Sequence, residues 1–454
     1  MKKMTNTELL ERGELTPLLL KLSAPAMIGM FLISLYNVVD AFFVGRGIGA
    51  MGIAAVFIMF PASLVIVGSA QAFGAGGASV TSRLLGAKDN ERAERVLASV
   101  LFYGFATGLT MGIFFFAFTE PLLSALGCSE ENLPSAALYA RIIFAGAPFF
   151  HIMMVMNNLV RGEGNTKLSM FSMAISSGVN IVLDWLFIFV FHWGVAGAAV
   201  ATDISQICAV VWLLYYYVSG KSEIALRRRF LSRPEPGLLA DVLKVGASTC
   251  MSNFGLAFSW SVLTRIFASA GGDIAVASSG LIQRLFSIVV MPVIGMGHGL
   301  LPIVGYNYGA GRYDRIRSVM KLALVFSNLF CAACAAVIFL FPEELLSFFA
   351  ESMEMVQMGV PGTRFIAAGV IFAGCQISTA TFYQGIGEGG RALFCSVMRP
   401  VIFLPGLAVL FTYLWGLTGT WLSFTAADWF ASAVCMSLYY FSYKKLISHD
   451  FTAE

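Results

Sequence analysis

The sequence carries little charge. Asp, Glu, Lys and Arg make up 12% of the 454 residues, whereas about a quarter is usual in soluble domains. Hydrophobic residues reach 58%, and 40 of the residues are Phe. Because a water-soluble core cannot bury so much apolar surface, we expect the lipid bilayer to be the solvent. The net charge of +3 is too small to indicate a nucleic acid partner, and we expect none.

Motifs for metal or nucleophile chemistry are also missing. The four His have no ligand-like spacing, and none of the eight Cys forms a CxxC pair beside a His. We therefore interpret the cysteines as small buried apolar side chains. No HExxH or nucleophile motif appears, so an enzyme is the weakest interpretation and we expect no cofactor. Acids precede the first apolar stretch and no small-residue cleavage site follows it, so we expect no cleavable signal peptide.

Twelve apolar runs dominate the chain, and each is long enough to cross about 30 Å of hydrocarbon as a helix. Runs of this length without alternation do not form barrel strands. The sequence therefore predicts an all-α polytopic membrane protein. The runs lie near residues 17–43, 52–80, 97–119, 135–160, 168–191, 194–218, 242–269, 275–306, 319–341, 359–384, 393–414 and 416–442.

The loop charges predict the orientation in the membrane. Basic residues cluster at the N-terminus and recur in every second loop, while the intervening loops carry mostly acids. We expect the protein to lie in the inner (plasma) membrane of the cell. The positive-inside rule then places both termini and the 219–241 connection on the cytoplasmic side. An even number of spans is required by this result, and the twelve runs agree with it.

The chain also repeats itself. The segment GAGGASVTSRLLGAKDNERAERV at 74–96 aligns with GHGLLPIVGYNYGAGRYDRIRSV at 297–319, and GEG recurs at 162–164 and 387–389. We therefore predict two six-helix bundles related by a pseudo-two-fold axis along the membrane normal. Ligands in such folds bind between the halves near the midplane. The predicted domains are an N-terminal lobe, a cytoplasmic linker and a C-terminal lobe, at 1–218, 219–241 and 242–454.

Two aspartates, Asp40 and Asp184, lie inside apolar runs. A carboxylate at this depth costs about 2.5–3.5 kcal/mol, so such a residue usually marks an ion or proton path. Asn180 lies one helical turn before Asp184, and Thr202 lies early in the sixth run, so all four could meet at one depth. Their oxygen donors suit Na⁺, or a shared proton if the two acids are close. Alternatively, each acid pairs with a buried Arg or caps a broken helix.

Several segments in this order resemble the multidrug and toxic compound extrusion (MATE) family, in particular its prokaryotic DinF-like branch. The resemblance covers roughly 15–445. It implies a twelve-helix cation-coupled exporter, in which Asp40, Asn180, Asp184 and Thr202 bind Na⁺ or H⁺. The segments are LSAPAMIGMFLISLYNVVDAFFVG in the first run, TSRLLGAKD after the second, RGEGNTK after the fourth, NIVLDWLFIF in the fifth and WGVAGAAVATDISQ in the sixth.

The resemblance also suggests a helix bend and a cargo cavity. Pro25 interrupts the hydrogen-bond ladder of the first span, and the resemblance suggests that this helix bends when the cation site changes occupancy; a static kink is the alternative. Tyr36, Asn37, Met153 and Asn157 occupy positions that line the drug cavity in similar proteins. Met and aromatic surfaces adapt to varied apolar ligands, although a Met-rich face is also ordinary packing.

A second acidic pair, Asp203 and Asp428, lies at equivalent positions of the sixth and twelfth spans. We expect either a secondary role in coupling or a structural pairing with a basic side chain. Three arginines, Arg265, Arg284 and Arg399, fall within or near C-terminal spans and need partners. Asp428 is a candidate partner, and anionic substrate or lipid phosphate is the alternative. The seventh and tenth spans hold no mid-span acid, which favours a cation site in the N-terminal half.

These features predict an antiporter, working as a monomer surrounded by membrane lipid. It would export organic, often cationic and amphipathic compounds by alternating access, driven by Na⁺ or H⁺. The sequence leaves the choice of ion open, because carboxylates and amides serve both. The strongest alternative is a flippase for a lipid-linked oligosaccharide or lipid, from the same superfamily. A ligand-gated channel or sensory protein is a third class, which the two-fold repeat with coupling acids makes less favoured.

Overall fold

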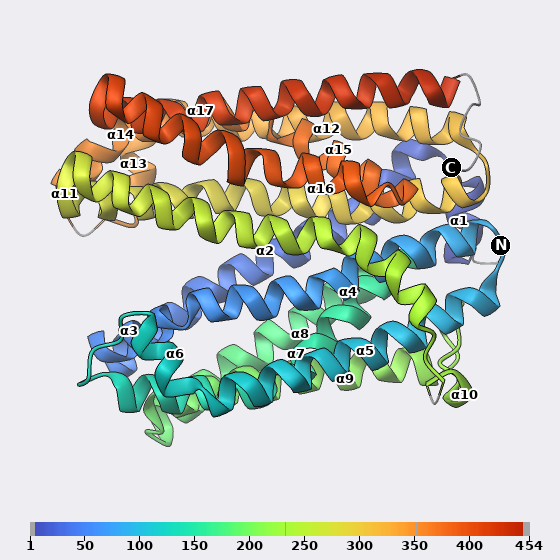
Figure 1. Ribbon diagram of the computed structural model, residues 1–454, viewed down its shortest axis with the longest axis horizontal. Coiled ribbons are helices and arrows are strands. Elements are labelled where there is room, and N and C mark those ends of the chain that lie inside the picture. The colour runs from blue at the N-terminus through green and yellow to red at the C-terminus, as the bar shows by residue number, and fades with distance from the viewer. Residues whose placement is uncertain (1–4, 232, 351, 448–454) are drawn as a thin grey trace.

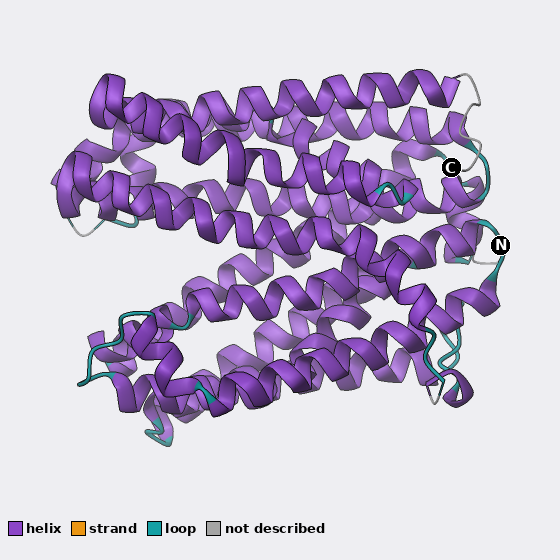
Figure 2. Ribbon diagram, viewed as in Figure 1, coloured by secondary structure: helices purple, strands orange, loops and turns teal. Residues whose placement is uncertain are grey.

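The structure is a computed structural model that describes residues 5–231, 233–350 and 352–447. The described chain is almost entirely helical, and no strand occurs within these ranges (Figure 2). Helices satisfy their own backbone hydrogen bonds, which is the requirement for crossing hydrocarbon. Large apolar side chains such as Phe102 and Ile113 remain exposed, as a lipid-facing surface demands.

The first half of the chain forms a bundle that we call the N-lobe. Six segments cross it, and shorter helices cap its ends. The crossing segments are α2 (Leu15–Ile48), α4 (Phe60–Gly86), α5 (Asn90–Ala117), α7 (Leu133–Gly162), α8 (Thr166–Asp184) with the π-helix η1 (Trp185–Val190), and α9 (Gly194–Val218); the short helices are α1 (Asn6–Arg12), α3 (Ala50–Ile58) and α6 (Thr119–Ala125).

The second half forms the C-lobe, which is reached through the short helix α10 (Arg228–Leu231). Its helices are longer because some of them contain two crossings. They are α11 (Pro236–Gly309), α12 (Tyr313–Leu340), α13 (Pro342–Ser347), α14 (Met353–Val370), α15 (Ala373–Ile386), α16 (Gly389–Val397), the π-helix η2 (Met398–Phe403) and α17 (Leu404–Ile447).

Two glycines account for the long helices. Gly272 in α11 has φ 68° and ψ −163°, and Gly416 in α17 has φ 61° and ψ −143°. A residue with a side chain rarely adopts such angles, and each glycine reverses the chain between two crossings. Nine described helices, or ten counting the bent pair α14–α15, are long and apolar enough to span a membrane. Dividing α11 and α17 brings the total to the twelve that the sequence predicts; the exact domain boundaries stay a prediction.

The two lobes pack tightly at one end of the molecule, where α1 and the last turn of α17 lie (Figure 1). We call this the proximal end and the opposite one the distal end. Helix α4 meets both halves of α11 there through glycines. A Cβ on Gly246 would lie 1.7 Å from the carbonyl oxygen of Ala72, and one on Gly86 would lie 2.0 Å from that of Tyr306. Only glycine permits backbones to approach this closely.

The buried apolar core also differs between the proximal and distal ends. One cluster near the proximal end joins the lobes, since it holds Leu97 and Val160 of the N-lobe with Val242, Val304 and Phe382 of the C-lobe. Toward the distal end each lobe has clusters of its own. The ribbons of the two lobes diverge in that direction (Figure 1). The lobes are therefore joined at the proximal end and separate at the distal end.

Candidate cation site

Asp40 of α2 and Asp184 of α8 lie together in the distal half of the N-lobe. Asp184 is fully buried and Asp40 is partly buried. A hydrogen bond joins their carboxyl groups. Two ionised carboxylates this close repel one another, which favours a proton on one of the two groups. The pair is therefore arranged to share a proton, or a small cation in its place.

Asn180 and Thr202 complete the oxygen set from α8 and α9. The amide nitrogen of Asn180 donates to the hydroxyl of Thr202 at 3.3 Å, and that hydroxyl donates to the carbonyl oxygen of Ala198 at 3.0 Å. Asn180 is buried, with 1% of its surface exposed. The structure thus brings together all four residues that the sequence nominates, although binding of a cation by them stays a prediction.

Two tyrosines border this group. Tyr36 of α2 hydrogen-bonds Thr202 and lies within electrostatic range of both acids. Tyr139 of α7 lies within range of Asp40 and Asp184 and was not identified from the sequence. Its signal was a phenol inside an otherwise apolar run, which alone does not distinguish a site from packing. Helices α2, α7, α8 and α9 all contribute to the site.

The helix geometry changes next to Asp184. This residue ends α8 and is followed directly by the π-helix η1. In a π-helix each backbone hydrogen bond spans five residues instead of four. Single π-turns are frequent at functional sites, because they redirect one side chain without ending the helix. The change from α-helix to π-helix therefore falls directly beside the acid.

The predicted bend and cavity residues have mixed surroundings. Helix α2 continues without a break across Pro25, so bending there stays a prediction. Met153 is partly buried, and the side chain of Asn37 lies outside the described part. Asn157 is buried and links α7 to α8, donating to the Ser172 hydroxyl at 3.2 Å and accepting from Ser169 at 2.5 Å. Its amide is thus occupied within the protein, and a cargo contact at Asn157 is the least supported of the four.

Asp203 lies on α9, beside the same group but turned toward α7. One of its carboxyl oxygens is buried and has no hydrogen-bond partner. A Cβ on Gly146 would lie within 2.0 to 2.5 Å of all three atoms of that carboxyl group. Glycine at 146 therefore provides the space that this acid occupies. Tyr139 is within electrostatic range of Asp203 as well as of Asp40 and Asp184.

Asp428, the equivalent residue of the C-lobe, has a partner. Arg399 of the π-helix η2 hydrogen-bonds both of its oxygens, the second at 3.3 Å. The amide of Gln376 donates to the Asp428 carbonyl oxygen at 3.0 Å, and the guanidinium of Arg399 stacks over Phe286 at 5.0 Å. The pairing suggested by the sequence is present, whereas Arg265 and Arg284 are exposed on α11.

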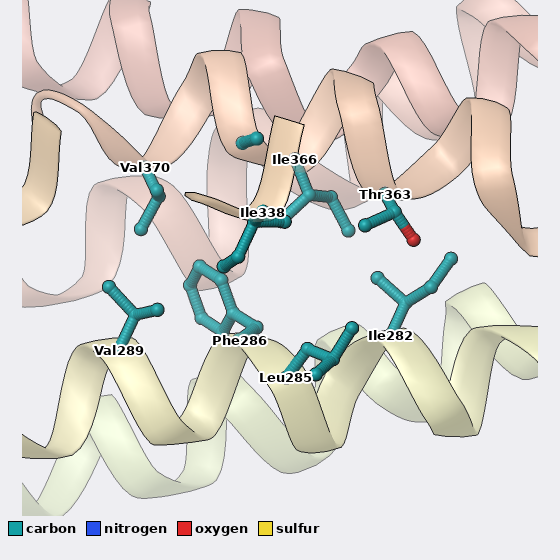
Figure 3. A pocket seen from close by; sticks show the side chains of 9 residues that line it. Ile282, Leu285, Phe286, Val289, Ile338, Thr363, Ile366 and Val370 are labelled. Carbon is teal, nitrogen blue, oxygen red and sulfur yellow. The ribbon is translucent and has the colours of Figure 1, made fainter. Parts of the chain in front are cut away.

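The C-lobe contains an apolar pocket between α11, α12 and α14 (Figure 3). Its walls are aliphatic and aromatic apart from Thr363, whose hydroxyl donates to the Gly359 carbonyl oxygen at 3.0 Å. A second pocket lies beside it against Arg399 and Gln283. The second pocket is also lined mainly by apolar side chains, among them Trp260, Phe286 and Phe424.

The chain matches the MatE family model twice, over residues 25–186 and 249–410. The chain belongs to the MatE family. The two matches correspond to the two lobes, which confirms the repeat seen in the sequence. Membership confirms the expected resemblance, the all-α two-lobed fold and the multi-pass membrane protein class.

Relatives and solved structures agree with this assignment. Multidrug export protein MepA of Staphylococcus aureus strain NCTC 8325 is 26% identical over 430 residues, which cover 95% of this chain and 94% of MepA. The crystal structure of MATE in complex with MaL6 superposes with a TM-score of 0.94 at 27% identity, covering 98% and 100% of the two chains. An outward-facing multidrug resistance MATE transporter superposes equally well, at 0.94 and 28% identity, over 99% and 100%.

Within the described residues, no group of three His, Cys, Asp or Glu could hold a metal ion. An ion at the Asp40–Asp184 pair would therefore depend on neutral oxygens for its remaining contacts. The amide of Asn180 and the hydroxyls of Thr202 and Tyr36 are the groups placed to supply them.

Proposed function

We propose that this MATE protein is a cation-coupled antiporter that exports organic, often cationic and amphipathic compounds. The observation that carries the proposal is the hydrogen-bonded carboxyl pair of Asp40 and Asp184, buried in a lobe that otherwise reads as membrane-spanning. Burying two acids in a membrane-spanning lobe is costly, and such residues usually mark the path of an ion or proton that binds and is released. The multidrug export named for the MepA relatives supports an organic cargo.

The coupling ion acts by neutralising charge. An ion on the pair removes the cost of a bare carboxylate in a low-dielectric site, and leaves α2 free to pack differently against α8 and α9. Cargo binds between the lobes with the opposite preference. By linkage, the free energy with which the ion weakens cargo binding equals that with which cargo weakens ion binding. Either Na⁺ or H⁺ fits the oxygen donors.

The direction of transport follows from the loop charges. Positive loops place the proximal end in the cytoplasm, so the end at which the lobes are joined faces inward. The lobes then diverge toward the outside, in the arrangement that the outward-facing relative shares. In this state the coupling ion reaches Asp40 and Asp184 from outside. The acids on the cavity side of the N-lobe, Asp40 and Asp184, favour a cationic cargo over a lipid-linked sugar.

The test is efflux of a fluorescent cationic dye from vesicles that contain the purified protein. A sodium gradient and a pH gradient are imposed in separate experiments, so that the coupling ion is identified along with transport. We expect Asp40→Asn and Asp184→Asn each to abolish gradient-driven efflux while leaving the yield of folded protein unchanged. Asp273→Asn is the control, because it removes one negative charge at an exposed position of α11. Normal efflux by both test variants would remove the proposed site.

A further inference from the structure

Helix α1 at the proximal end is attached to the N-lobe. Leu10 is 1% exposed and packs into the buried cluster that joins the lobes. Its side chain rests on Gly164, where a Cβ would lie 3.1 Å from the Leu10 Cδ1 atom. The backbone nitrogen of Thr7 donates to a carboxylate oxygen of Glu223 at 2.9 Å, and the Thr7 hydroxyl donates to the other oxygen. Glu223 follows α9, so this contact also belongs to the N-lobe side.

The other side of α1 is held by the C-lobe. Arg312 donates to the backbone oxygen of Glu11 at 2.6 Å and to its carboxylate at 3.0 Å. Arg315 donates to the backbone oxygen of Gly13 at 2.7 Å, and its Nε is fixed by Asn307 at 3.0 Å. The last carbonyl groups of a helix have no partner within the helix and attract positive charge. Two arginines at the start of α12, Arg312 just before the helix and Arg315 in its first turn, therefore complete the end of α1.

The start of the C-lobe makes a similar contact with the opposite lobe. Glu235 caps the start of α11, the first long helix of the C-lobe, yet its contacts are with the N-lobe. Its backbone nitrogen donates to the Ser99 hydroxyl at 3.0 Å, and its carboxylate pairs with Arg95 at 2.6 Å. The segments that lead into α2 and α11 are thus each bound to the opposite lobe. Contact between the leading segment and the opposite lobe therefore occurs in both repeats.

From this arrangement we propose that α1 is a strap, which holds the lobes together at the proximal end and must leave Arg312 and Arg315 before they separate there. The proposal rests on the proposed function in one respect, since alternating access requires that separation. The glycine contacts between α4 and α11 allow close packing of the lobes but involve no charged groups. The strap adds charge-assisted hydrogen bonds that are either made or broken, which suits a two-state element.

Pulsed EPR distances across the proximal end test the strap. Spin labels are placed at Asn90→Cys on α5 and Ser318→Cys on α12, both exposed, in the full-length protein with its native cysteines replaced. For the paired substitution Arg312→Ala/Arg315→Ala we expect the ratio of long to short distances to rise about tenfold or more. Leu10→Asp, which releases α1 from the N-lobe instead, should produce the same shift.

The control is Lys321→Ala, which removes a positive charge from an exposed position further along α12. Should the arginine pair fail to fold, Glu11→Ala removes only one contact and should give a smaller shift in the same direction. Unchanged distances in the arginine and Leu10 variants, or an equal shift with Lys321→Ala, would overturn the strap. The distances are measured without cargo or a gradient, so a failure of the strap is distinguishable from a failure of coupled efflux.

Discussion

Arg399 and Asp428 form a buried ion pair in the C-lobe, with 12% and 1% of their side chains exposed. The repeat places Asp203 at the equivalent position of the N-lobe, where one carboxyl oxygen is buried and has no hydrogen-bond partner among the described residues. A glycine faces each acid, Gly369 for Asp428 and Gly146 for Asp203. Both lobes therefore have an acid and a glycine that leaves space for it, and the C-lobe acid also has a counter-charge. Arg399 thus neutralises the C-lobe acid, whereas a role for the N-lobe acids in ion binding stays a prediction.

Breaking the C-lobe pair should destabilise the protein. Arg399→Ala leaves the carboxylate of Asp428 buried without its cation, and we expect a loss of about 3–5 kcal/mol in the free energy of unfolding. The double variant Arg399→Met/Asp428→Leu should recover most of it, because both charges are then absent. Unfolding in mixed detergent micelles measures the two values. Equal losses in the single and double variants would contradict an ion pair as the cause.

The space for Asp203 can be tested in the same way. Gly146→Ala places a methyl group on the Asp203 carboxyl, and we expect it to destabilise the fold by about 1–3 kcal/mol. Gly178→Ala on α8 is the matched control, since nothing lies within 4 Å of its Cβ position. Adding Asp203→Ala to Gly146→Ala should restore stability beyond the sum of the single effects. Additive effects in the double-mutant cycle would show that the two residues do not press on one another.

Much of the fold could be predicted because bilayer constraints are strong. Span length, loop charge and the internal repeat each depend on short-range sequence patterns, and they gave twelve crossings in two bundles. The breaks between the seventh and eighth runs and between the eleventh and twelfth runs correspond to turns at Gly272 and Gly416. In the structure each of these turns is a single non-helical glycine within a long helix. The predicted linker at 219–241 includes the start of α11 at Pro236, and the domain boundaries themselves stay a prediction.

The site was predictable only in part. Asp40, Asn180 and Asp184 could be nominated because a polar side chain in an apolar run needs a reason. Tyr139 could not, because a phenol is common in membrane helices and only the packing of α7 shows that it faces the acids. The occupied amide of Asn157 likewise depends on α8 packing beside α7. Side-chain direction is set by tertiary contacts that a single sequence does not reveal.

The hydroxyl of Thr202 should matter for ion binding. Thr202→Val keeps the shape but removes the group that accepts from Asn180 at 3.3 Å. We expect the apparent affinity for the coupling ion to fall about 5- to 30-fold, as for the loss of one buried hydrogen bond of about 1–2 kcal/mol. Thr110→Val is the control, because this exposed threonine also bonds the carbonyl four residues earlier. An unchanged ion dependence of dye efflux would exclude Thr202 from the site.

Glu163 should make stability fall as the pH rises. It lies between α7 and α8, is fully buried, and accepts hydrogen bonds from Ser222 at 2.6 Å and Tyr216 at 3.1 Å. Burial raises the pKa of Glu163 to about 7 from 4.5, although those hydroxyls partly lower it. Since the folded state then holds the proton more tightly than the unfolded one, stability is full below about pH 4.5 and declines by about 3 kcal/mol as the pH passes 7.

Glu163→Gln keeps both accepted hydrogen bonds and cannot ionise. We expect it to equal the parent protein at pH 4.5 and to exceed it by about 3 kcal/mol at pH 8, measured as the free energy of unfolding in micelles. The matched control is Glu388→Gln at the equivalent position of the C-lobe, where the carboxylate already pairs with Arg391 at 2.5 Å. That variant loses an ion pair and should gain no stability at pH 8. A parent protein whose stability stays level between pH 4.5 and pH 8 would show that Glu163 is not a buried acid of this kind.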